Sequence, residues 1–221
     1  DASGVVPSSF RIARRLLDRL EDSVSGRILP AAFHAPIPDE RVAQARVASG
    51  ILGETMVKRF PWSGRTRPMV DGNAEVVLNR TWRPALSITG ADGLPPIANA
   101  GNVLRPATKL KLSLRIPPTL DGEQATAELK ALLEADPPHG ATVRFEPDQG
   151  ATGWNAPATA TWLADAIDAS SRTFYGQPSG ALGEGGTIPF MGMLGKQFPE
   201  AQFLITGVLG PRSNAHGPNE F

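Results

Sequence analysis

A histidine near the end of the chain stands in a setting that suits a metal ligand. His216 lies within Asn-Ala-His-Gly-Pro-Asn-Glu (214–220), where glycine, proline and asparagine favour a turn that can present one imidazole in a cleft. Neutral imidazole is the commonest metal ligand in proteins and suits zinc. The alternative is a structural histidine that caps a turn or fills a core. Catalytic zinc needs at least three protein ligands, so one histidine cannot hold the ion by itself.

A glycine-rich segment, Glu-Gly-Gly-Thr-Ile-Pro (184–189), precedes this histidine. Gly185 and Gly186 have no Cβ, so the backbone there can approach a substrate closely, and Thr187 can hydrogen-bond it. A glycine pair before a helix could alternatively hold a phosphate. The sequence lacks the Lys-Ser/Thr pair and the spaced third glycine that would complete a nucleotide-binding fingerprint. We therefore predict that Gly185, Gly186 and Thr187 bind a substrate other than a nucleotide.

Two further side chains could act on a substrate. Residues 109–116 alternate polar residues with leucine or isoleucine, which predicts a strand with one wet face, and Arg115 belongs to that face. Its guanidinium could hold a carboxylate through two hydrogen bonds, or it could simply be solvated. Asn102, thirteen positions earlier, could donate its amide to a developing oxyanion, or it could stabilise a turn.

The elements that must position these residues can be read from periodicity, caps and breakers. We expect helices from Ser8 or Ser9 to Gly26, over 39–53, from Asp121 to Pro137, and over 158–174 and 189–198, with strands over 84–89, 109–116, 141–145 and 203–208. Residues 148–157 look like a linker. The first half predicts helices on one face of an antiparallel sheet, and the last third alternates as in α/β units. Arg11, Arg15 and Arg19 form a stripe on the first helix that is either a solvated face or an anion site.

Composition narrows the possible partners. The chain has 221 residues, 22 basic and 22 acidic side chains and no cysteine. No global field recruits nucleic acid or an anionic membrane, so we expect neither as a partner. No apolar run approaches the roughly 20 residues that span a bilayer. The absence of cysteine excludes disulfides and thiolate metal sites and fits a reducing cytoplasm.

Four motifs in order give the chain a family resemblance. They are Trp82-Arg83-Pro84 before a short strand, Asn102 to Pro106 with Arg115 thirteen positions after Asn102, the segment Glu184 to Pro189, and the segment Asn214 to Glu220. Together they resemble the zinc exopeptidases that include carnosinases, Cys-Gly dipeptidases, aminoacylases and succinyl-diaminopimelate desuccinylase (metallopeptidase family twenty). The resemblance implies a metal ligand at His216, a substrate-binding Arg115 and a catalytic Asn102 that reaches the neighbouring subunit's site.

The same resemblance implies a fold and a domain division. We expect a ferredoxin-like α+β lid, or dimerisation, domain over 1–147, followed by the C-terminal part of an α/β zinc-peptidase catalytic domain over 148–221. The lid would pair two subunits into a homodimer. Asp1 would follow directly after the family's His-Ser-Gly motif, and Phe221 would precede a final helix. We therefore expect this chain to be a fragment of a longer enzyme.

The implied activity is hydrolysis of dipeptides or related amide bonds of amino acids by a cytoplasmic enzyme with two zinc ions per subunit. The family's His-x-Asp and Glu-Glu motifs are absent from the sequence. We therefore expect this chain alone to lack the general base and most of the metal ligands, to bind no zinc and to be inactive. Two alternatives stay open: a deacylase of N-acyl amino acids or succinyl-diaminopimelate within the family, and a non-catalytic α+β module for dimerisation or ligand binding.

Overall fold

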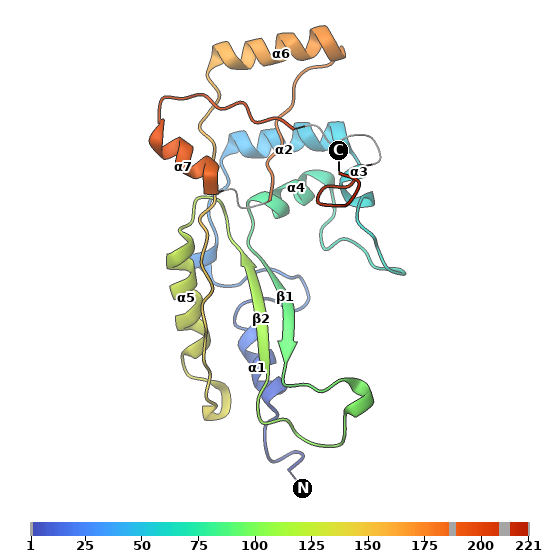
Figure 1. Cartoon of the computed structure of the whole chain (residues 1–221), viewed down its shortest axis with the longest axis vertical. Coiled ribbons are helices and arrows are strands. Elements are labelled where there is room, and N and C mark those ends of the chain that lie inside the picture. The colour runs from blue at the N-terminus through green and yellow to red at the C-terminus, as the bar shows by residue number, and fades with distance from the viewer. Residues whose placement is uncertain (1, 186–188, 208–212, 221) are drawn as a thin grey trace. The chain divides into compact units, whose positions relative to one another are not determined.

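The computed structural model describes residues 2–185, 189–207 and 213–220, and Figure 1 shows their arrangement. Its helices are α1 (Ser9–Leu17), α2 (Asp39–Leu52), α3 (Thr55–Lys58), α4 (Asn73–Thr81), α5 (Gly122–Glu134), α6 (Thr161–Tyr175) and α7 (Pro189–Gln197), with short 3₁₀ turns η1 (Ala31–Phe33), η2 (Ile97–Asn99) and η3 (Pro138–Gly140). Its strands are β1 (Ala85–Asp92) and β2 (Lys109–Arg115). None of these helices is long and apolar enough to cross a membrane.

The described chain divides into two compact units. Residues up to Asn155 together with 180–192 form the first, and residues 156–179 together with those from Met193 onward form the second. The sequence places a domain boundary between residues 147 and 148, and that placement stays a prediction.

An antiparallel hairpin of β1 and β2 is the sheet of the first unit. Ala85 pairs with Arg115 at one end and Asp92 with Lys109 at the other, and the register shifts between Ile88 and Gly90. Along β2 the odd-numbered residues are exposed and the even-numbered leucines are partly buried, which confirms the predicted wet face. The chain is therefore a mixed α and β protein with a small two-stranded sheet, and this sheet does not confirm the ferredoxin-like description.

Helices α1 and α5 cover the apolar side of this hairpin. Leu112 and Leu114 of β2 pack against a buried cluster that the two helices and the segment between α1 and α2 supply: Leu16, Leu20, Ile28, Phe33, Leu129 and Leu133. Phe33 is only 1% exposed, and burying such a side chain contributes about 1.5–3 kcal/mol. The predicted caps are confirmed, since Ser8 accepts from the Arg11 amide and Asp121 from the Gln124 amide.

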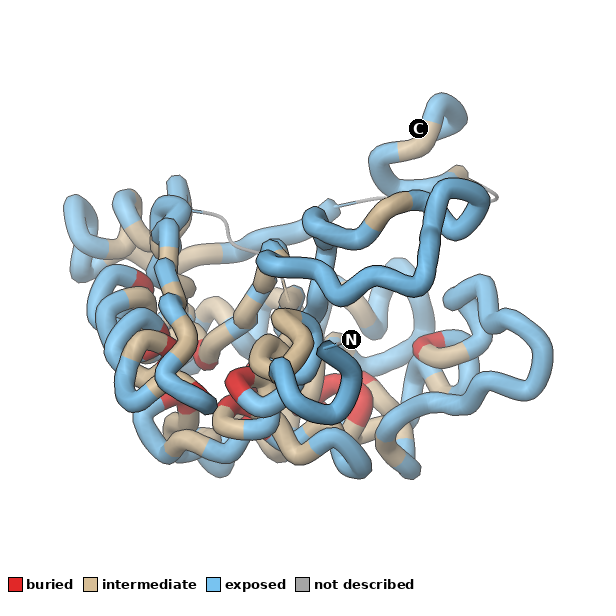
Figure 2. The backbone as a smooth tube through the Cα atoms, turned by 90° about the horizontal axis from the view of Figure 1, so that it is seen from below, coloured by how far each residue is buried: buried red, intermediate tan, exposed pale blue. Residues whose placement is uncertain are grey.

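A second core joins α2, α3 and α4. Its buried members are Ala45, Met56, Val76, Val77, Leu78 and Trp82. The sequence predicted α2 with nearly its observed bounds but gave no sign of α4 or of this cluster. Figure 2 shows that the buried stretches of the backbone are short and that exposed or partly exposed residues flank them. Among the described residues, the buried side chains form two small clusters.

Helix α1 is shorter than predicted. It ends at Leu17, and the amides of Arg19 and Leu20 then bond to carbonyls only three residues back. The chain turns because Glu21 and Ile28 form a β-bridge, and the Leu29 amide donates to the Leu20 carbonyl. This closure replaces the last predicted helical turns, yet Leu20 remains fully buried.

Two predicted strands are wrong. Residues 141–145 form no strand; instead Glu134 Oε1 accepts the Phe145 amide at 2.8 Å, so a side chain takes the hydrogen bond that a neighbouring strand would have taken. Residues 203–207 form no strand either, and Leu204 and Ile205 are about 60% exposed. A strand needs a partner strand, and the sheet of the described residues consists of β1 and β2 alone.

The predicted linker, residues 148–157, packs in part against the start of α5. Gly122, at the start of α5, donates its amide to Thr152 Oγ1 at 3.0 Å. A Cβ on Gly150 would lie 2.3 Å from the Gly122 carbonyl oxygen, so residues 150–152 pack tightly against that helix end. Residues 156–179 then belong to the second unit, where Ala160 donates its amide to Gln202 Oε1 at 2.6 Å just before α6.

Candidate functional site

The glycine-rich segment contacts the end of α4 within the first unit. A Cβ on Gly185 would lie 2.2 Å from the backbone oxygen of Arg80, a separation that real Cβ atoms do not show. A Cβ on Gly183 would lie 3.1 Å from the methyl carbon of Thr81, which is a tight contact with a side chain. Glycine at 185 is therefore required by the α4 backbone of this same chain. Gly186 and Thr187, two of the predicted substrate-binding residues, lie outside the described residues.

Arg115 reaches this glycine-rich segment. Its Nη1 donates a hydrogen bond to the carbonyl of Gly185, seventy residues later in the sequence. The register of the hairpin makes this contact possible, because Arg115 pairs with Ala85, and Ala85 follows α4 by only a few residues. A guanidinium has five N–H donors in a planar fork, so the contact with one carbonyl leaves capacity for a carboxylate.

A second arginine, which sequence reasoning missed, contacts the neighbouring residue of the same segment. Arg80 Nη2 lies 3.0 Å from Glu184 Oε2, and the arginine side chain is 27% exposed against 64% for the glutamate. No local signal identifies Arg80, because its partner is 104 residues away and its helix was not predicted. Two guanidiniums thus contact two consecutive residues, Glu184 and Gly185.

The wet face of β2 carries another cation with a partner. Lys111 forms an ion pair with Asp148 and donates a hydrogen bond to it, and this interaction lowers the pKa of the Asp148 carboxyl below its usual range. Both Lys111 and Arg115 are therefore engaged by residues that come after α5. Lys111 and Arg115 on the exposed face of β2 therefore bind later segments of the chain and are not merely solvated.

Asn102 lies far along the hairpin from Arg115. It is exposed in the loop between β1 and β2, and Figure 1 shows that this loop extends from the end of the hairpin opposite Arg115. The six residue steps from Lys109 to Arg115 span about 20 Å at the usual strand rise. The fold therefore does not bring the two predicted residues together within one chain.

His216 lies at the tip of a tight, self-contained turn in the second unit. Its backbone adopts a left-handed conformation with φ of 61°, and its side chain is 96% exposed. Glu220 accepts the His216 amide at 2.6 Å, whereas the imidazole Nδ1 lies 3.9 Å from the same carboxylate. Across the base of the turn, Asn214 Nδ2 donates a hydrogen bond to Asn219 Oδ1 at 3.1 Å. The neighbours therefore fix the turn and leave the imidazole projecting.

The described residues do not build a metal centre. Across residues 2–185, 189–207 and 213–220, no three histidine, aspartate or glutamate side chains gather closely enough to hold an ion. His216 can offer one nitrogen, but zinc needs at least three protein ligands in a catalytic site. The residues present therefore do not fit a zinc ion, and no catalytic step through zinc can be assigned to them.

Comparison with known proteins gives the family context. The profile of the family described as "Peptidase dimerisation domain" matches residues 2–141. The cysteinylglycine-S-conjugate dipeptidase of Corynebacterium striatum is 30% identical over 145 residues, which cover 62% of this chain and 30% of that enzyme. The chain thus spans less than a third of the length of this curated relative.

Solved structures agree at the level of the fold. The M20 family metallo-carboxypeptidase Sso-CP2 from Sulfolobus solfataricus superposes with a TM-score of 0.69 at 18% identity, over 99% of this chain and 49% of that one. The di-peptidase Dug1p from Saccharomyces cerevisiae gives 0.63 at 22% identity, over 90% and 41%. Human carnosine dipeptidase 1 gives 0.61 at 22% identity, over 88% and 41%.

Proposed function

This chain belongs to the M20 peptidase dimerisation-domain family, and we propose from that premise that it forms part of a zinc-dependent dipeptidase. The complete protein would hydrolyse dipeptides or related amide bonds of amino acids. The names of two similar proteins, a cysteinylglycine-S-conjugate dipeptidase and a carnosine dipeptidase, favour dipeptides over N-acyl amino acids as substrates.

The observation that carries this proposal is the contact between Arg115 and Gly185. An enzyme that cuts dipeptides must recognise a free terminal carboxylate, and a guanidinium can bind one through two parallel hydrogen bonds. The backbone carbonyl of Gly185 accepts a hydrogen bond from that guanidinium. We infer that the substrate carboxylate binds to Arg115 while the backbone after Gly185 holds the remainder of the substrate.

The metal chemistry would need groups beyond the described residues. His216 would supply one of the zinc ligands, and zinc bound in the complete protein would supply Lewis-acid chemistry. The turn that Glu220 closes would keep the imidazole exposed for that role. Because these residues provide neither the other ligands nor a general base, we propose that the chain alone is inactive.

Asn102 would act in the other subunit of a homodimer. Within one chain it lies at the opposite end of the hairpin from Arg115, whereas a second copy could present its own loop to that site. Residues 101–107 of this loop are all exposed, so the loop is accessible to a second subunit. There Asn102 would donate its amide to the oxyanion that develops on the scissile carbonyl, and a donor of this kind is worth about 2.7–4 kcal/mol of barrier. We place the enzyme in the cytoplasm, which suits a chain without cysteine.

Hydrolysis assays on the complete zinc-loaded protein test this function. The panel would contain dipeptides, including cysteinylglycine conjugates, and N-acyl amino acids. We expect zinc-dependent release of amino acids from the dipeptides and slower or no release from the acylated compounds. An enzyme that retains zinc but cleaves none of these substrates would rule the proposal out.

A further inference from the structure

We propose that Arg80 is a positioning residue that binds Glu184 and thereby keeps this carboxylate away from Arg115. This inference rests on the proposed function, because it assigns Arg115 to the substrate's carboxylate. Arg80 would not touch the substrate. Its effect would be to leave the Arg115 guanidinium available to the incoming anion.

Glu184 lies close enough to Arg115 to compete with a substrate carboxylate for its guanidinium. Arg115 donates to the carbonyl of Gly185, and Glu184 is the residue immediately before that glycine. Adjacent Cα atoms are only about 3.8 Å apart, so the flexible glutamate side chain lies within reach of the same guanidinium. A carboxylate in the protein competes directly with a carboxylate on a substrate, because both use the planar donor fork of arginine.

Arg80 is well placed to hold the competitor. Its Nη2 lies 3.0 Å from Glu184 Oε2, and its side chain is the more buried of the two, at 27% exposed against 64% for the glutamate. The backbone at Arg80 also contacts Gly185 so closely that a Cβ would not fit. The segment can therefore dock on α4 through the backbone alone, and the ion pair serves to direct the Glu184 side chain.

The end of α4 forms a fixed platform for this arrangement. Val77 and Leu78 are buried in the second core, and Trp82, the residue after the helix, is 6% exposed. The Trp82 amide donates to the Leu78 carbonyl at 2.8 Å, and the Thr81 hydroxyl donates to the Val77 carbonyl at the same distance. The helical turn that contains Arg80 is thus fixed by buried residues before and after it.

The decisive experiment compares KM values of three variants of the complete enzyme with a dipeptide substrate. Arg80→Ala should raise KM roughly fivefold, the upper range for an exposed ion pair, with kcat nearly unchanged. Glu184→Gln alone should leave KM close to the wild-type value, because the competing charge has gone. The double variant should return KM to near wild type, since a neutral residue at 184 needs no partner.

This rescue separates the inference from a merely structural role. If the ion pair only stabilised the fold, both single variants would raise KM alike and the double variant would not recover. That pattern, or an unchanged KM in Arg80→Ala, would overturn the proposal. Lys130→Ala is the matched control: Lys130 lies in the second half of α5 and forms a partly exposed ion pair with Glu134, and its removal should leave the kinetics unchanged.

A second readout distinguishes this inference from the proposed function. If the wild-type enzyme cleaves no substrate, the dipeptidase assignment fails, and acetate then serves as the carboxylate probe for Arg115 in an NMR titration of its guanidinium. Arg80→Ala should weaken acetate binding several-fold relative to Lys130→Ala, because Glu184 would then compete for the same donors. Equal acetate affinity in the two variants would overturn the role of Arg80 independently of any activity.

Discussion

Arg115 and Gly185 are seventy residues apart in the sequence, yet the guanidinium of one donates to the carbonyl of the other. The hairpin register places Arg115 beside Ala85, at the entry to β1 directly after α4, and the glycine-rich segment docks on α4. The contact thus joins β2 to residues 180–185, which return to the first unit after α6. It brings the Arg115 guanidinium and the backbone of the glycine-rich segment together.

Arg115→Ala should remove discrimination between a dipeptide and its C-terminal amide. Truncating a hydrogen bond to a charged group costs about 1.5–3 kcal/mol, or roughly 10- to 150-fold in kcat/KM for the free acid. The amide, which has no carboxylate, should lose much less. Arg115→Lys is the matched variant and should recover only part of the loss, because ammonium lacks the planar fork. Equal losses for both substrates would show that Arg115 does not bind the carboxylate.

Gly185→Ala should disturb the docking of the glycine-rich segment. The new Cβ would fall 2.2 Å from the Arg80 carbonyl oxygen, which is backbone and cannot swing away. We expect destabilisation of about 1–3 kcal/mol, as for overpacking elsewhere, and a rise in KM.

Thermal unfolding of Gly50→Ala provides the control for Gly185→Ala. Gly50 lies within α2 with nothing within 4 Å of its would-be Cβ, so alanine there should stabilise the protein by about 0.5–1 kcal/mol. Similar melting temperatures for the two variants would contradict the close approach at Gly185.

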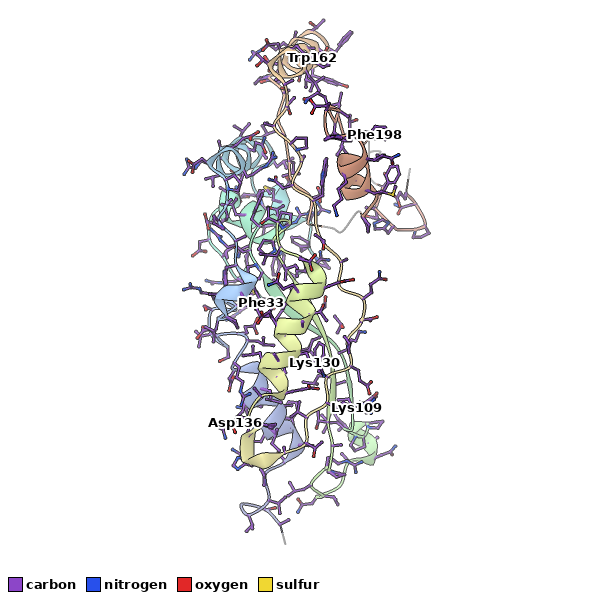
Figure 3. The ribbon with its side chains drawn as sticks, turned by 90° about the vertical axis from the view of Figure 1, so that its left-hand side faces the viewer. Phe33, Lys109, Lys130, Asp136, Trp162 and Phe198 are labelled. Atoms are coloured by element: carbon purple, nitrogen blue, oxygen red, sulfur yellow. The ribbon has the colours of Figure 1, made fainter. Side chains whose placement is uncertain are left out.

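Arg19→Ala should destabilise the first core. Arg19 belongs to the stripe that could have been a solvated face or an anion site, but its guanidinium donates to the carbonyls of Leu132, Ala135 and Asp136. These groups lie at the C-terminal end of α5, where Figure 3 labels Asp136, and they have no partners within the helix. Losing the cation should cost about 1–3 kcal/mol in denaturant unfolding.

Arg15→Ala is the companion variant for that experiment. Arg15 is exposed on α1, which ends two residues before Arg19, so its removal should change the unfolding free energy by no more than about 0.5 kcal/mol. If both alanine variants unfold alike, the capping role of Arg19 is wrong.

Acid should release the segment that follows η3. Donation from Lys130 and then from the Phe145 amide lowers the pKa of Glu134 below its ordinary value of 4.5. A lowered folded-state pKa means that the stabilisation is complete above 4.5 and is lost as the pH falls through that lower value. The Phe145 amide resonance should follow this titration by NMR.

Glu134→Gln should abolish the pH dependence of the Phe145 resonance. Glutamine keeps an oxygen that can accept the amide but does not titrate, so the resonance should stay constant through the acid range. Glu128, which is exposed on α5, supplies the control Glu128→Gln, and the titration should persist there. A Phe145 shift that still titrates in Glu134→Gln would refute the assignment.

His216→Asn should weaken zinc binding by the complete protein, because one ligand is lost. A chelator should therefore remove the metal more easily from this variant than from the wild type. Asparagine tolerates the left-handed backbone at this position, where φ is 61°, so the turn should survive. His139→Asn is the control, because His139 also has positive φ, at 60°, and lies outside the proposed site. Identical chelator sensitivity of the two variants would exclude His216 as a ligand.

The sequence by itself determined the local elements and the chemistry they could offer. The polar and apolar alternation along 109–116 fixed the wet face of β2, and caps at Ser8 and Asp121 fixed the starts of α1 and α5. These signals act within a few residues, so they survive in any tertiary arrangement. The same reading failed at 141–145, where a glutamate from α5 captured a backbone amide that was expected to join a sheet.

Only the tertiary structure decided which residues meet. Arg19 reaches carbonyls 113 to 117 residues away, and Arg80 reaches Glu184 across 104 residues. Such contacts depend on the register of the hairpin and on the packing of two separate cores, and neither leaves a periodic trace near the residues concerned. Periodicity and caps report on neighbours along the chain, whereas a binding surface is assembled from segments that become neighbours only after folding.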